Sequence, residues 1–77
     1  MTAQDTALAA LRADLRDGFL TPGDQVVQET LAERYGVSRV PLREALKTLE
    51  AEGQVVYHPN RGYFVTELRV ADLLEVY

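Results

Sequence analysis

The segment from Gly36 to Gly53 constrains the fold of this 77-residue chain more than any other. It begins with a turn and continues through Ser38, an N-cap residue whose hydroxyl can accept a hydrogen bond from a free backbone N–H. An amphipathic helix follows. Arg39 lies at the start of this predicted helix, where the positive end of the helix dipole disfavours a cation by roughly 0.3–1 kcal/mol. An arginine kept at such a position indicates a role outside the fold, and a DNA phosphate or a guanine edge is the obvious ligand.

Three helices are predicted from apolar side chains at helical spacing and from the glycines that follow them. The first two cover Gln4 to Asp17 and Glu29 to Tyr35. The third begins after Ser38 and ends near Glu52, and Pro41 costs little because it lies in the first turn. The apolar face of the third helix repeats at i, i+3, i+4 and i+7, and consists of Leu42, Ala45, Leu46 and Leu49.

Strand-like runs surround the second and third helices. Gln25 to Val27 follows a proline–glycine turn, and two further runs cover Gln54 to Tyr57 and Tyr63 to Thr66. The loop from His58 to Gly62 is rich in turn formers, which is typical of a hairpin. The order helix, short strand, helix, turn, helix, hairpin predicts a mainly α fold with a small β-hairpin, a winged helix-turn-helix.

Composition excludes several classes of function. The chain has no cysteine and a single histidine, which leaves neither a disulfide framework nor a thiolate or multi-histidine metal site. We find no phosphate loop and no catalytic constellation, so we expect no enzyme activity and no cofactor in this segment. No apolar run approaches the ~20 residues that a membrane helix needs, and a cytoplasmic protein without a membrane partner is the default expectation.

The charge is unevenly distributed. The net charge is −4, from 8 basic and 12 acidic residues, which by itself argues against a nucleic-acid partner. Between Arg34 and Arg61, however, five basic residues and three acidic residues give +2, which leaves −6 for the remainder. The chain therefore has a basic middle within an acidic body.

The basic side chains of the third helix are spaced by four. Arg39, Arg43 and Lys47 span an arc of about 80°, away from Leu42, Ala45 and Leu49. A recognition helix in the major groove needs this division: arginine binds guanine O6 and N7, and Val40 at the tip can contact a thymine methyl. The alternative is a solvated face whose lysine pairs with Glu44 or Glu50.

The predicted hairpin tip carries Arg61 and Gly62. An arginine there can enter the minor groove, and glycine allows the backbone to approach closely. Alternatively, Gly62 makes the turn and Arg61 is a surface residue; for Gly62 the two roles can coexist.

These motifs and their spacing resemble those of the DNA-binding domain of the GntR family of bacterial transcription regulators. The resemblance rests on Pro22-Gly23-Asp24, Leu31-Ala32-Glu33, Gly36-Val37-Ser38-Arg39, Pro41-Leu42-Arg43-Glu44-Ala45-Leu46, Leu49-Glu50-Ala51-Glu52-Gly53 and Pro59-Asn60-Arg61-Gly62. The last of these, with the tail from Ala71 to Tyr77, is similar to the FadR-type branch. The resemblance implies a homodimer on a short palindromic operator, with dimerisation and small-molecule effector binding in a C-terminal helical domain outside this segment. It also implies that Ser38, Arg39, Arg43 and Gly62 face DNA.

Three positions depart from the family pattern. Val40 stands where threonine is frequent, Glu29 where arginine is frequent, and Val27 where a polar cap is favoured. These changes affect phosphate contacts and operator sequence more than the fold.

We therefore predict a winged helix-turn-helix over residues 1–66, and a linker with the start of a truncated helical effector domain over residues 67–77. The tail repeats its apolar side chains at Val70, Leu73, Leu74 and Tyr77, as a helix would.

The predicted function is the sequence-specific DNA-binding domain of a ligand-responsive regulator, most often a repressor. The alternative is a winged helix used for protein–protein contact, which the pI of about 4.8 favours. The predicted DNA-binding residues are Arg34, Ser38, Arg39, Val40, Arg43, Lys47, Arg61 and Gly62.

Overall fold

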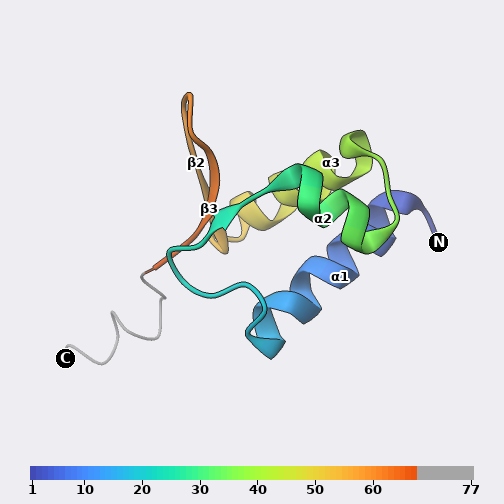
Figure 1. Cartoon of the computed structure of the whole chain (residues 1–77), viewed down its shortest axis with the longest axis horizontal. Helices are drawn as coiled ribbons and strands as arrows, with labels where there is room; N and C mark the ends of the chain where they lie inside the picture. The colour runs from blue at the N-terminus through green and yellow to red at the C-terminus, as the bar shows by residue number, and fades with distance from the viewer. Residues whose placement is uncertain (68–77) are drawn as a thin grey trace.

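The computed structural model describes residues 1–67 and has three helices and a small sheet (Figure 1). The elements in chain order are α1 (Ala3–Asp17), β1 (Gln25–Val26), α2 (Gln28–Tyr35), α3 (Arg39–Ala51), β2 (Val55–His58) and β3 (Gly62–Val65). Each predicted element within these residues is present, with bounds that differ by one residue at most. The helix predicted from Val70 to Tyr77 lies outside the described residues.

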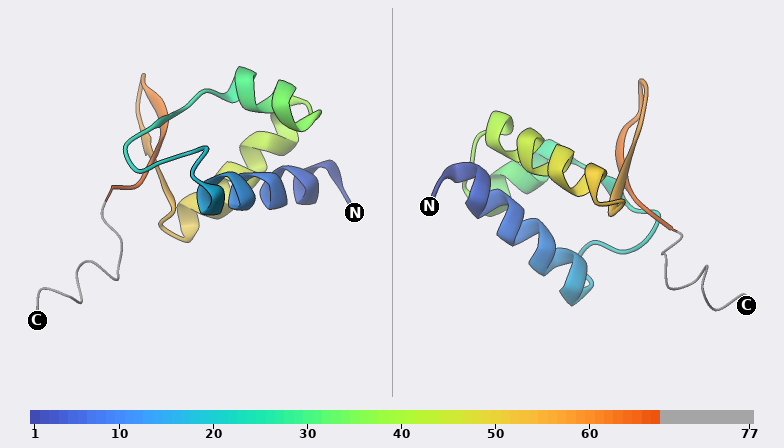
Figure 2. Two further views of the ribbon diagram at one scale, coloured as in Figure 1. Left: turned by 60° about the horizontal axis from the view of Figure 1, so that its bottom comes forward. Right: turned by 180° about the vertical axis from the view of Figure 1, so that it is seen from behind.

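The core lies where α3 packs against α1 and α2, as two further views show (Figure 2). The predicted apolar face of α3 is fully buried. Leu11 of α1 meets it from the other side and is 1% exposed. Burying a leucine side chain stabilises a fold by about 1.5–3 kcal/mol, so this cluster holds α3 rigidly and leaves its opposite side outward.

The turn between α2 and α3 depends on Gly36. Its φ of +69° lies in the left-handed region, where a side chain would be strained. The backbone N–H of Gly36 donates to the carbonyl of Glu33 at 3.3 Å, and that of Val37 donates to Ala32 at 3.0 Å. These bonds end α2 and set the direction in which α3 leaves.

The sheet has the strand order β1-β3-β2 and is antiparallel throughout. Val55 pairs with Val65 at its base, and both are buried against the helices. Short β1 pairs with β3 through Gln25 opposite Phe64. The β2–β3 hairpin projects from the helical body, next to the end of α3 (Figure 1). This hairpin is the wing of the predicted fold.

Candidate nucleic-acid interface

Ser38 occupies the N-cap position of α3 with extended backbone, as predicted, but its side chain makes no capping hydrogen bond. The predicted side-chain cap is therefore wrong. A capping hydroxyl accepts from the second or third backbone N–H of the helix, and the third residue here is Pro41, which has none. The exposed hydroxyl stays available at the positive end of the helix dipole, an environment that suits a phosphate oxygen.

The outward side of α3 is basic and has an apolar tip. The side chains of Arg39 and Lys47 are 62% and 61% exposed, and Val40 is 70% exposed. Arg43 is also exposed and lies between them along the helix. The predicted separation of a core side and a basic side is confirmed by this burial pattern.

Carboxylates lie close to two of these three cations. Nζ of Lys47 is 3.3 Å from Oε2 of Glu44, and a guanidinium nitrogen of Arg39 is 3.6 Å from Oε2 of Glu29. The predicted alternative of ion pairing therefore holds for Lys47 with Glu44. Arg43 is in no ion pair within residues 1–67. Exposed ion pairs contribute only about 0–1 kcal/mol, so DNA can displace them.

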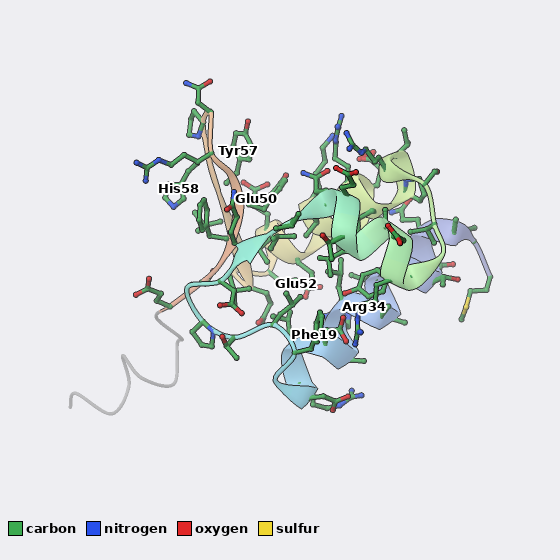
Figure 3. The ribbon with its side chains drawn as sticks, in the orientation of Figure 1. Phe19, Arg34, Glu50, Glu52, Tyr57 and His58 are labelled. Atoms are coloured by element: carbon green, nitrogen blue, oxygen red, sulfur yellow. The ribbon has the colours of Figure 1, made fainter. Side chains whose placement is uncertain are left out.

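Glu50, the other carboxylate considered for Lys47, lies at the base of the wing instead (Figure 3). It accepts a hydrogen bond of 3.2 Å from the hydroxyl of Tyr63. Burial, with the adjacent Glu50 carboxylate, raises the pKa of Tyr63, and the hydroxyl therefore stays protonated as the donor. This bond connects α3 to β3 and fixes the wing relative to the helix.

The wing loop is held by its own backbone and by β1. The backbone N–H of Arg61 donates to the carbonyl of His58 at 3.0 Å, and Nε2 of Gln25 donates to the carbonyl of Arg61 at 2.9 Å. The exposed Arg61 side chain thus starts from an anchored backbone. Tyr57 and His58 lie on opposite sides of the hairpin, where their rings contact those of Tyr63 and Phe64 (Figure 3).

Gly62 has a φ of +95° and open space where a side chain would begin. We therefore expect Gly62→Ala to lower the free energy of unfolding by about 1–2 kcal/mol through backbone strain alone. Urea unfolding followed by circular dichroism measures the change, with Arg61→Ala as the control that keeps the glycine. An unchanged midpoint for Gly62→Ala would show that the turn does not require glycine.

Arg34 is paired with residues of the fold, although its side chain is 44% exposed. Its guanidinium donates to both carboxylate oxygens of Asp14, at 3.0 and 3.1 Å, and lies 3.7 Å above the centre of the Phe19 ring (Figure 3). The hydroxyl of Tyr35 donates to the same carboxylate at 2.6 Å. This ion pair joins α2 to α1, and the phosphate contact of Arg34 stays a prediction.

The sequence prediction missed two residues that organise the site. The sequence predicts only a strand at Gln25, and no local pattern indicates its bond to the wing. Asp14 carried a usable signal, because it follows Ala7 and Leu11 on the buried stripe of α1. A charged residue at such a position indicates a partner within the fold.

These features define a class of protein: a helix-turn-helix with a basic outward helix and an adjoining hairpin is a DNA-binding winged helix. The chain belongs to the GntR family of bacterial regulatory proteins. The family model described as "Bacterial regulatory proteins, gntR family" matches residues 3–65. Membership favours DNA binding over the alternative of a protein–protein module, and the relatives are transcriptional regulators rather than enzymes.

Two relatives and one solved structure illustrate the similarity. The chain is 34% identical over 67 residues to the HTH-type transcriptional regulator YdhC of Bacillus subtilis, covering 87% of this chain and 30% of that protein. It is 40% identical over 72 residues to an HTH-type transcriptional regulator of Mycobacterium tuberculosis, and this match covers 94% of this chain and 30% of that protein. A structure described as "Lar controls the expression of the Listeria monocytogenes agr system and mediates virulence" superposes with a TM-score of 0.84 at 32% identity. This match covers 99% of this chain and 36% of that protein chain. The chain thus spans about a third of the length of these proteins.

Two further findings concern the described residues alone. No helix in this part of the chain is long and apolar enough to cross a membrane. Residues 1–67 also contain no group of histidine, cysteine and carboxylate side chains that could hold a metal ion.

Proposed function

We propose that α3 of this DNA-binding domain lies in the major groove of a specific operator while the β2–β3 wing reaches the adjacent minor groove. The observation that carries this proposal is the division of α3 into a buried leucine face and an exposed basic face. The wing, fixed to α3 through Tyr63 and Glu50, projects beside that basic face. A helix of this kind can enter the groove without disturbing the core.

The contacts follow from the chemistry of each side chain. We assign base recognition to Arg39 and Arg43, whose guanidinium groups suit the O6 and N7 acceptors of guanine, and a thymine methyl contact to Val40. Ser38 and Lys47 bind phosphates, the first with its uncapped hydroxyl and the second as a point charge. We assign Arg61 and Gly62 to the minor groove, whose negative potential attracts arginine.

The proposal for the whole protein extends the family assignment. We infer a homodimer on a short palindromic operator, with dimerisation and small-molecule effector binding in a C-terminal helical domain, as in the FadR-type branch. Residues 1–66 then form the DNA-binding domain without a cofactor, and residues 67–77 lead toward the effector domain. We infer a repressor that acts in the cytoplasm, where the bacterial chromosome lies.

A salt titration tests the phosphate contacts. After selection of an operator from a random DNA pool, we expect the logarithm of the binding constant to fall linearly with the logarithm of salt concentration. The slope is negative because each phosphate that a cation such as Lys47 neutralises adds about −0.9. A single module of this kind buries only about 600–1,000 Å² on DNA, so we expect weak binding that fluorescence anisotropy can follow. Binding that does not change with salt would contradict the proposal.

A further inference from the structure

An acidic side chain lies at the edge of the basic face. Glu29 is in the first turn of α2, its side chain is 81% exposed, and its carboxylate is 3.6 Å from the guanidinium of Arg39. Arg39 is one of the two arginines that we assign to base recognition. The exposed side chains of both residues can separate at little cost.

The two helix starts explain why the pair forms. The N-cap of α2 is Val27, which makes no side-chain hydrogen bond, so Glu29 is the acidic residue that compensates the positive end of this helix. The first turn of α3 has no acidic residue and carries Arg39 there instead. The carboxylate of Glu29 thus stabilises its own helix and also holds a cation that the dipole of α3 disfavours.

We propose that Glu29 sets the affinity for DNA because its carboxylate competes with DNA for Arg39. On a cognate site, two hydrogen bonds to a guanine replace the ion pair. On other sequences, Arg39 gains only attraction to phosphates, and the negative charge of Glu29 cancels much of that attraction. Glu29 therefore weakens binding to both kinds of sequence, and the cognate site loses the full free energy of the ion pair because the pair must break there. This inference rests on the proposed function, in which Arg39 faces DNA.

The test compares Glu29→Gln with Glu33→Gln, which removes the same charge from the same helix. Glu33 is exposed and is in no ion pair within residues 1–67. We measure binding to a fluorescently labelled mixed-sequence duplex and to an operator selected from a random pool. Glu29→Gln is expected to bind the operator about 1.5- to 5-fold more tightly, the range that loss of an exposed ion pair implies, and to bind the mixed-sequence duplex more tightly by no more than that factor. Its salt slope on mixed DNA becomes steeper by about 0.9.

A second variant separates the ion pair from the stability of α2. Glu29→Asp keeps a negative charge in the first turn but shortens the side chain, so its fold is retained and its gain on the operator is smaller than that of Glu29→Gln. Equal gains for Glu29→Gln and Glu33→Gln, or no gain for Glu29→Gln, would overturn the inference. If the unaltered protein bound neither duplex, the proposed function itself would fail.

Discussion

Arg43→Ala is expected to abolish discrimination at one base pair of the operator, with a loss of about 1–3 kcal/mol in the preference for the cognate base. Arg43 is exposed in the middle of the basic face and has no carboxylate partner within residues 1–67, so its guanidinium is free to form a bidentate contact. Binding to a panel of single-base operator variants measures the effect. The profile should flatten at one position and stay unchanged elsewhere.

Lys47→Ala is the matched variant for this experiment, since it removes one positive charge a single helical turn further along α3. An ammonium group attracts phosphates without reading the base sequence, so Lys47→Ala should weaken binding to every operator variant by a similar factor. Both substitutions are at exposed positions and should change the free energy of unfolding by no more than about 0.5 kcal/mol. Identical, uniform losses for the two variants would refute the assigned roles.

Asp14→Ala is expected to lower the free energy of unfolding by about 2–3 kcal/mol. Removing one partner of a buried ion pair costs about 3–5 kcal/mol, and the partial exposure of Arg34 reduces that value here. The substitution also leaves the hydroxyl of Tyr35 without its acceptor. Urea unfolding measures the loss, with Asp17→Ala on the same helix as the control. Asp17 is 68% exposed, so we expect a change within about 0.5 kcal/mol.

The same carboxylate should make stability depend on pH. The hydrogen bonds from Arg34 outweigh the effect of burial and, with the bond from Tyr35, hold the pKa of Asp14 below its usual value. A lowered pKa in the folded state stabilises the protein above the unfolded-state value of about 3.9, and this stabilisation is lost as the pH falls through the folded-state pKa. The acid-induced loss of stability should therefore be shallower in Asp14→Ala. Identical pH profiles for the variant and the unaltered protein would contradict this linkage.

The helices could be predicted because local rules and tertiary packing agree there. In α3, for example, the leucine spacing, the N-cap position and the terminating glycine all indicate the same helix. Ser38 shows where such rules conflict: it is a favoured N-cap residue, but Pro41 removes a backbone N–H that its hydroxyl could have accepted from. Pro41 is the third residue of the predicted helix, so the sequence itself indicates that the third backbone N–H is missing.

The basic residues were harder to assign because their partners are distant in sequence. Arg34 belongs to the basic middle of the chain by charge, yet Asp14, twenty residues earlier, holds it within the fold. The pairing of Arg39 with Glu29 depends likewise on how α2 and α3 meet across their turn. Spacing along one helix predicts which side a residue faces, whereas these contacts require the packing of two helices.

Mapping the DNA contact surface by amide chemical shifts tests the central claim most directly. The chain, labelled with ¹⁵N, is titrated with an operator duplex selected from a random pool. We expect the largest shift changes from Ser38 to Lys47 and from His58 to Gly62, which together form the basic face of α3 and the wing. Shift changes confined to α1, or none at saturating duplex, would contradict the proposed interface.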